Sequence, residues 1–339
     1  MTEISQNAKT VQLAPSALSD GRGILRRIVG WDSFGLLVVF IALFVALSIL
    51  APSFFTVTNQ LSILQNAAFF GIVAFAMTLV IVAGEIDISV GSMAALSSAL
   101  IGVFVVKHGI PMVISLVLVL GIAALIGAFA GAMRTYFNVP TFISSLALYL
   151  ALRGLAQLLT SNFPIPIDAG QFFYWGTTGR VFGIPVAALY LVVVGIVAGV
   201  IARRTVFGRS IYAVGGNSKA AGLSGLPVRR IKILVMTISA TVAAITGLLQ
   251  SALLSSGNST IGVGLEFDAI AATIIGGAAL TGGKGTIAGT TIGVLFIASL
   301  LNGMVLLNVN PYAQQVVRGA VVLIAVVVNV WRSRRSAVS

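Results

Sequence analysis

Residues 215–227 of this chain read Gly215-Gly216-Asn217-Ser218-Lys219-Ala220-Ala221-Gly222-Leu223-Ser224-Gly225-Leu226-Pro227. The pattern predicts one short helix, because Asn217 or Ser218 can cap its first free N–H groups. Gly225 suits the left-handed residue that follows a helix end, and Pro227 prevents continuation. The helix lies within residues 203–232, the longest polar interruption between two apolar runs. Its position predicts that a partner protein grips it.

Residues 203–232 contain seven basic residues and no acidic residue: Arg203, Arg204, Arg209, Lys219, Arg229, Arg230 and Lys232. Such a run has two interpretations. It is either a docking segment or a solvated loop whose positive charge only fixes the orientation of the chain in a membrane. Ala220 and Ala221 are small, so a docked helix could approach a partner surface closely.

The composition places the chain in a membrane. Of 339 residues, 58% are hydrophobic and 8% are charged, whereas soluble domains have roughly 45–50% apolar residues. The net charge of +12 does not indicate a nucleic-acid partner, because the basic residues lie in short gaps between apolar runs. The chain has no cysteine, which excludes disulfides and thiolate metal sites. Its one histidine, His108, lies beside Lys107 in a short loop and is interpreted as a solvated residue.

Ten apolar segments predict an all-α polytopic membrane protein. They cover residues 34–51, 66–83, 93–106, 110–133, 140–160, 184–202, 233–254, 269–280, 287–307 and 312–331. A bilayer core of roughly 30 Å needs about 20 helical residues. The third and eighth segments are short by this measure, so whether they cross completely is left open.

The basic residues predict the orientation. Ten spans place both termini on one side of the membrane. If that side is the cytoplasm, sixteen of the 20 Lys and Arg residues lie inside and only Lys107 and Arg180 lie outside. This asymmetry predicts cytoplasmic termini and a cytoplasmic position for residues 203–232.

Three segments make up the predicted domain organisation. Residues 1–33 form a cytoplasmic tail, in which residues 21–31 suit a helix lying in the membrane interface. Residues 34–332 form the transmembrane domain, and residues 333–339 form a short cytoplasmic tail. The transmembrane domain contains two weakly similar halves, because glycine-containing stretches at residues 84–91 and 276–283 lie on either side of residues 203–232. Interrupted helices at matching positions are typical of transporters with repeated halves.

The first of these stretches reads Gly84-Glu85-Ile86-Asp87-Ile88-Ser89-Val90-Gly91-Ser92. Ionisable residues at membrane depth are costly and usually functional. Asp87 and Ser89 suit the positive N-terminal end of the helix that follows, so we predict that Asp87 caps it, with direct ligand contact as the alternative. No nucleophile or metal cluster accompanies the two acids, so a hydrolase is not indicated.

The second stretch reads Gly276-Gly277-Ala278-Ala279-Leu280-Thr281-Gly282-Gly283-Lys284-Gly285. It is not a phosphate-binding loop, which would need glycine at Ala278 and Ser or Thr at Gly285. Close helix packing through small residues explains the glycines better. Arg153 and Arg318 lie inside predicted spans, where they either snorkel to the interface or pair with an acid such as Asp168, Glu266 or Asp268.

Four of these segments resemble motifs of the ribose-type sugar permeases, within the superfamily of branched-chain amino acid and sugar permeases. Residues 84–92 resemble the family signature Gly-Gly-Ile-Asp-Leu-Ser-Val-Gly. Residues 139–143 with Arg153-Gly154, residues 207–217 and residues 276–285 resemble three later motifs, and the likeness spans about residues 34–332. Two departures are Glu85, where a second glycine is usual, and Gly222, where a larger residue is common.

The resemblance implies the membrane subunit of an ATP-driven, binding-protein-dependent importer for a monosaccharide or similar polyol in the bacterial inner membrane. It implies a cytoplasmic ABC ATPase, a periplasmic solute-binding protein, a second permease copy and surrounding lipid as partners. The ATPase would use ATP and magnesium, so this chain would be a transport subunit without a cofactor or enzymatic activity of its own. The alternatives are a nucleoside or branched-chain amino acid permease of the same superfamily and an ion-coupled secondary transporter.

The resemblance also implies roles for three sets of residues. Coupling to the ATPase would use Asn217, Ser218, Lys219, Ala220, Ala221, Gly222 and Leu223. An inner-mouth motif would comprise Gly84, Glu85, Asp87, Ser89, Gly91 and Ser92. A late glycine motif would comprise Gly276, Gly277, Gly282, Gly283 and Gly285.

Overall fold

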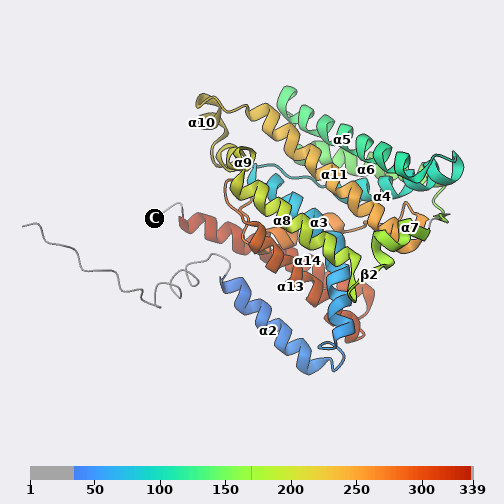
Figure 1. Ribbon diagram of the computed structural model, residues 1–339. Helices are drawn as coiled ribbons and strands as arrows, with labels where there is room; N and C mark the ends of the chain where they lie inside the picture. The colour runs from blue at the N-terminus through green and yellow to red at the C-terminus, as the bar shows by residue number, and fades with distance from the viewer. Residues whose placement is uncertain (1–33, 169, 337–339) are drawn as a thin grey trace, which may run out of the picture.

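The structure, a computed structural model, describes residues 34–168 and 170–336 and is a bundle of helices (Figure 1). The predicted interfacial helix at residues 21–31 therefore lies outside the described residues. The longer helices are α2 (Phe34–Leu50), α3 (Val57–Val82), α4 (Val90–Gly102), α5 (Met112–Tyr136), α6 (Thr141–Thr160), α8 (Val186–Arg204), α9 (Val206–Gly216), α11 (Val228–Leu254), α12 (Leu265–Ile275), α13 (Ile287–Leu306) and α14 (Pro311–Ser336). The last of them extends four residues into the predicted C-terminal tail.

Short elements complete the described chain. They are the helices α7 (Gly170–Phe173) and α10 (Ser218–Leu223) and the π-helical turns η1 (Val103–Lys107) and η2 (Tyr174–Thr178). Four two-residue strands, β1 (Ile165–Pro166), β2 (Arg180–Val181), β3 (Ile184–Pro185) and β4 (Ser256–Gly257), form the antiparallel pairs β1–β4 and β2–β3. The β2–β3 pair closes a hairpin, and the β1–β4 pair joins two loops that are distant in the sequence. Neither pair belongs to a larger sheet among the described residues, so the prediction of an all-α fold is confirmed.

Eight of the described helices are long and apolar enough to cross a membrane. One of them is the predicted third span, because α4 and η1 form a continuous helix of 18 residues, Val90–Lys107. The apolar helix α2 has 17 residues. The predicted eighth span is reduced to the 11 residues of α12, about 16 Å of helix at 1.5 Å per residue. That length is too short for a hydrocarbon core of roughly 30 Å, so α12 alone does not cross.

Non-helical segments lie beside α4 and α12. Residues 83–89 connect α3 to α4, and residues 276–286 connect α12 to α13. Gly84, Gly277, Gly282 and Gly283 have positive φ angles, which glycine adopts without steric cost. The two predicted glycine-containing stretches are therefore the places where regular helix stops.

Glycines also allow the central helices to approach closely. A Cβ atom at Gly127 of α5 would lie 2.6 Å from the carbonyl oxygen of Met236 in α11, and one at Gly131 would lie 2.6 Å from the Cα atom of Ile233. Small residues permit such approach in membranes, where packing rather than water exclusion drives helix association. Helix α11 is thereby fixed against α5.

Figure 1 shows α9 and α10 at one end of the bundle, together with the start of α2 and the end of α14. The β2 strand and α7 lie at the opposite end. We refer to these as the α10 end and the β2 end. The first described helix thus begins, and the last one finishes, at the same end of the bundle.

Candidate functional site

The segment between α8 and α11 contains two short helices where the sequence predicted one. Helix α10 begins at Ser218, and the side-chain oxygen of Asn217 accepts a hydrogen bond of 3.0 Å from the N–H of Ala220. Gly225 has a φ angle of 83°, and α11 begins directly after Pro227. The predicted cap and stop of α10 are thus confirmed. Helix α9 was missed, because Gly208, Gly215 and Gly216 gave it the composition of a loop.

Helix α10 exposes most of its surface at the end of the bundle (Figure 1). Leu223 is 92% exposed, and Ala220 is exposed as well. Ala221 is 6% exposed and belongs to the hydrophobic core of the chain itself. This burial corrects the expectation that both alanines form a close contact with a partner: only Ala220 faces outward, and Leu223 is the largest apolar side chain that α10 offers.

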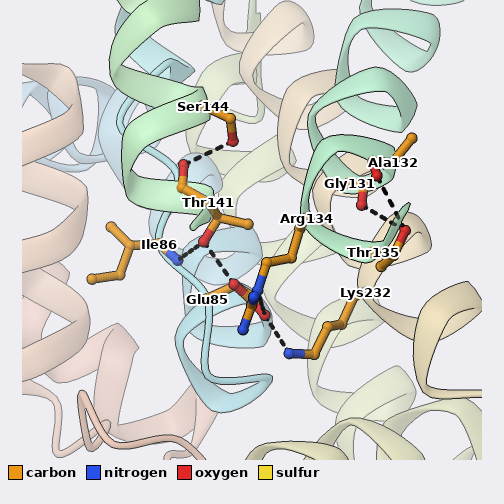
Figure 2. Close-up of polar contacts among 9 residues, drawn as sticks. All are labelled: Glu85, Ile86, Gly131, Ala132, Arg134, Thr135, Thr141, Ser144 and Lys232. Atoms are coloured by element: carbon orange, nitrogen blue, oxygen red, sulfur yellow. Dashed lines mark hydrogen bonds and ion pairs between the residues drawn. The ribbon is translucent and has the colours of Figure 1, made fainter. Parts of the chain in front are cut away.

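Glu85 of the inner-mouth motif lies at the centre of a buried polar cluster (Figure 2). Its side chain is 3% exposed and forms ion pairs with Lys232 of α11 and, at 3.1 Å, with Arg134 of α5. Thr141, at the start of α6, donates a 2.7 Å hydrogen bond to the second carboxylate oxygen. One acid therefore ties together the starts or ends of three helices and leaves one positive charge in excess.

The partners of Glu85 could not be found by reading along the chain. Lys232 is one of the seven basic residues of 203–232, whose pattern does not distinguish it from the others, but it is only 9% exposed. It lies in the first turns of α11, which follows α10 after a short connection. A displacement of α10 would therefore act directly on the residue that holds the inner-mouth motif.

Asp87 crosslinks the motif to α11 and does not cap α4. One carboxylate oxygen accepts hydrogen bonds from the N–H and the hydroxyl of Ser89, at 3.0 and 2.6 Å, and the other accepts one of 2.7 Å from Ser239. Ser89 is the residue before α4, and the helix has no side-chain cap. The capping prediction is therefore wrong. One carboxylate oxygen of Asp87 orders the turn before α4, and the other accepts the hydrogen bond from Ser239 of α11.

Gly91 and Ser92 lie where the short helices α4 and α12 meet. A Cβ atom at Gly91 would overlap a carboxylate oxygen of Glu266 and the carbonyl oxygen of Gly262. Glu266 is fully buried, and neither its carboxylate oxygens nor the hydroxyl of Ser92 has a hydrogen-bond partner among the described residues. Gly91 is thus required for close approach.

Three of the segments that resemble family motifs, residues 84–92, 207–217 and 276–285, meet at one backbone junction. The N–H of Gly283 donates a 2.8 Å hydrogen bond to the carbonyl oxygen of Val82, at the end of α3. A Cβ atom at Gly282 would lie 2.7 Å from the carbonyl oxygen of Gly215 in α9 and 3.1 Å from the Cα atom of Gly84. We call this contact of residues 82–84, 215–216 and 282–285 the glycine junction. It joins residues 203–232 to both non-helical stretches, and no local pattern in the chain predicts that contact.

We expect Gly215→Ala to destabilise the glycine junction. The added Cβ atom would overlap the carbonyl oxygen of Val82 and lie 2.7 Å from the nitrogen of Gly283. Backbone atoms cannot move aside as a flexible side chain can, and overpacking of this kind costs about 1–3 kcal/mol. Thermal unfolding of the purified protein should show a lower midpoint. Gly216→Ala is the control, since a Cβ atom there meets nothing within 4 Å.

The two arginines inside spans are held differently. Arg318 of α14 forms a 3.4 Å ion pair with Asp268 of α12, one of the acids proposed from the sequence. Arg153 donates to the carbonyl oxygens of Ser259 and Ile261, at 2.9 and 2.6 Å. Both contacts tie spans to the loop and short helix that follow α11. Within the described residues, no group of three or more His, Cys, Asp or Glu side chains could hold a metal ion.

Comparisons with known proteins agree with the helical architecture. The family model described as the permease component of the branched-chain amino acid transport system matches residues 59–326. The probable ABC transporter permease YphD of Escherichia coli K12 is 45% identical over 305 residues, which cover 90% of this chain and 91% of that protein. No solved structure matches this chain.

Two further relatives have named transport functions. The ribose import permease RbsC of Escherichia coli K12 is 38% identical over 296 residues, which cover 86% of this chain and 92% of that protein. The L-arabinose ABC transporter permease AraH of Azospirillum brasilense is 35% identical over 305 residues, covering 88% and 87%. These matches confirm the resemblance to ribose-type permeases that the four motifs indicated.

Proposed function

This chain belongs to the family of permease components of branched-chain amino acid transport systems, and we propose that it is the membrane subunit of an ATP-driven importer for a monosaccharide. It is a multi-pass inner-membrane protein and a transport subunit. The monosaccharide rests on the relatives named for ribose and L-arabinose import. The matches cover 86% and 88% of this chain.

The proposal includes the partners that the chain lacks. A cytoplasmic ATPase uses ATP and magnesium, a periplasmic binding protein delivers the sugar, and a second permease copy completes the pathway within the lipid. This chain binds no cofactor. The α10 end faces the cytoplasm, because the basic residues of 203–232 gather there and positive charge marks cytoplasmic loops.

The observation that supports coupling is the path from α10 to Glu85. Helix α10 presents exposed Leu223 and Ala220 to the ATPase. When the ATPase moves α10, the movement reaches Lys232 through the start of α11 and Gly215 through α9. Lys232 holds Glu85, and Gly215 touches Gly84 and Gly282 through the glycine junction. Both routes end at the non-helical stretches, residues 83–89 and 276–286. Their movement would open or close the cytoplasmic end of the sugar pathway.

Uptake measurements test the function. Cells that express this chain with its ATPase and binding protein should accumulate a radiolabelled sugar from a panel of D-ribose, L-arabinose and D-xylose, and accumulation should require ATP. Accumulation of L-leucine alone would contradict the proposal and favour the amino acid function in the family description. Accumulation of a radiolabelled nucleoside alone would favour the nucleoside permease, the other alternative within the superfamily. Uptake that persists without the ATPase would indicate an ion-coupled transporter.

Single cysteines test the orientation. The chain has no cysteine, so Ser218→Cys and Gly170→Cys each introduce one thiol. These residues begin α10 and α7, and the two helices lie at opposite ends of the bundle (Figure 1). We expect a membrane-impermeant thiol reagent to label Gly170→Cys in sealed cells and Ser218→Cys only after the cells are opened. Labelling of both in sealed cells would contradict the proposed topology.

A further inference from the structure

A cavity of about 370 Å³ lies in the half of the bundle nearer the β2 end, between α3, α11, α12, α13 and α14. Its rim includes exposed Asn66, Val263 and Val305, so the cavity reaches the surface. Small-molecule sites have volumes of about 300–1,000 Å³, and this cavity is at the lower end of that range. It is separate from the glycine junction and from the cluster around Glu85. We call it the outer cavity.

Several polar side chains that line the outer cavity have donors or acceptors that form no hydrogen bond with another described residue. Within the described residues, the side-chain amides of Asn66 and Gln250 have no partner. Each amide offers two donor hydrogens and an acceptor oxygen. Arg318 makes one contact to Asp268 at 3.4 Å, and its Nε atom is buried without a partner. A buried donor without a partner, such as the Arg318 Nε atom, is costly. The amides of exposed Asn66 and partly exposed Gln250 lie beside it, so this set suits a ligand that brings its own hydroxyl groups.

The charges and the apolar wall narrow the class of ligand. Asp268 and Arg318 neutralise each other, so the outer cavity has no net charge to attract an anion or a cation. Phe69 and Phe70 of α3 form part of its wall. The negative face of an aromatic ring attracts weakly positive C–H groups, which line one face of a sugar ring. A neutral polyol with one apolar face can therefore bind the polar side chains through its hydroxyl groups and contact Phe69 and Phe70 through its apolar face.

We propose that the outer cavity is the site where a neutral monosaccharide first binds the permease after release from the binding protein. This assignment rests on the proposed function and adds the residues that receive the sugar. Asn66, Gln250, Asp268 and Arg318 hold the hydroxyl groups, and Phe69 and Phe70 contact the apolar face of the ring. The site lies near the end that the topology assigns to the periplasm, where a binding protein delivers its sugar.

Protection of a single cysteine tests this site. Asn66→Cys places a thiol on the rim, and Ser62→Cys places a thiol at another exposed position of the same helix, outside the outer cavity. Both variants are treated with a membrane-impermeant methanethiosulfonate in the assembled transporter, with and without the panel sugar that the wild type transports. We expect the sugar to slow labelling of Asn66→Cys several-fold and to leave Ser62→Cys unchanged. Protection by L-leucine and not by the sugar would overturn the assignment.

A matched pair of glutamine variants adds a transport measurement. Gln250→Leu removes an amide from the outer cavity, and Gln157→Leu removes one from the exposed surface of α6. Loss of the contacts of one amide should lower the maximal uptake rate about tenfold, while Gln157→Leu should transport normally. The concentration for half-maximal uptake should change little, because the binding protein sets it.

The outcomes separate the two proposals. If the wild type transports no panel sugar, the proposed function fails and the assignment of the outer cavity fails with it. If the wild type transports sugar but Asn66→Cys is not protected and Gln250→Leu transports normally, only the outer cavity is wrongly assigned. The permease would then receive its sugar elsewhere.

Discussion

Glu85→Ala should abolish sugar uptake and lower the free energy of unfolding by about 3–5 kcal/mol, the cost of removing one member of a buried ion pair. The side chain of Lys232 is 11% exposed and would lose its counter-ion, while Arg134, at 33%, can still reach water. The loss should therefore come mainly from Lys232. Denaturation of the purified protein in mixed micelles measures stability, and uptake in cells measures function.

The control for this prediction is Asp168→Ala, because Asp168 is an exposed acid. A surface change of this kind should alter stability by no more than about 0.5 kcal/mol. Glu85→Gln should fall between the two variants, since its amide can still accept the hydrogen bond from Thr141. If Glu85→Ala unfolds like the wild type, Lys232 has another way to reach water and the buried pair does not stabilise the inner mouth.

A double variant separates stability from coupling. Replacing both charges, as Glu85→Leu with Lys232→Leu, removes the unpaired ion, and apolar replacements of buried pairs are often neutral for stability. We expect this variant to regain much of the lost stability but to remain defective in uptake, because α11 would no longer hold the motif through the ion pair. Wild-type uptake by the double variant would mean that the pair is only structural.

Local features of the chain were predictable from the sequence because they depend on neighbouring residues. The cap at Asn217, the left-handed Gly225 and the stop at Pro227 each follow from the backbone requirements of one residue. The apolar runs were equally clear, since a bilayer needs about 20 apolar residues per helix. The short eighth span could be flagged for the same reason, and the structure reduces it to α12.

Contacts between distant residues could not be predicted in this way. Glu85 and Lys232 are 147 positions apart, and nothing in the pattern around Lys232 distinguishes it from the exposed Arg229 and Arg230 beside it. The glycine junction was hidden for the same reason, because Gly215 owes its role to Val82 and Gly283. Helix periodicity reveals which residues share a face of one helix, and not which helix packs against that face.

The buried face of α10 could not be predicted from the sequence of the helix alone. The sequence identified the helix and its boundaries, but six residues make too few turns to reveal a buried face by periodicity. It treated Ala220 and Ala221 alike, and the structure separates them: Ala220 is exposed and Ala221 is 6% exposed. A charge at Ala221 would disturb the packing of α10 on its own chain, so its effect on uptake would not report on docking. A test of docking must use an outward residue.

Leu223→Asp should separate the permease from its ATPase without unfolding it. Leu223 is 92% exposed, so the substitution should change the stability of the isolated permease by no more than about 0.5 kcal/mol. If α10 sits in a groove of the ATPase, the new carboxylate would be buried without a partner, which costs several kcal/mol. We expect normal abundance in the membrane, loss of ATPase during co-purification and loss of uptake.

Phe182→Asp is the matched control for Leu223→Asp. Phe182 is fully exposed in the β2–β3 loop, at the end of the bundle opposite α10 (Figure 1). It therefore carries the same kind of change, from an exposed apolar side chain to a charge, away from the proposed ATPase contact. The ATPase should remain bound to Phe182→Asp during purification. If Leu223→Asp also retains its ATPase and transports sugar normally, α10 is a solvated connector, and the path from Leu223 through Lys232 to Glu85 does not carry the coupling.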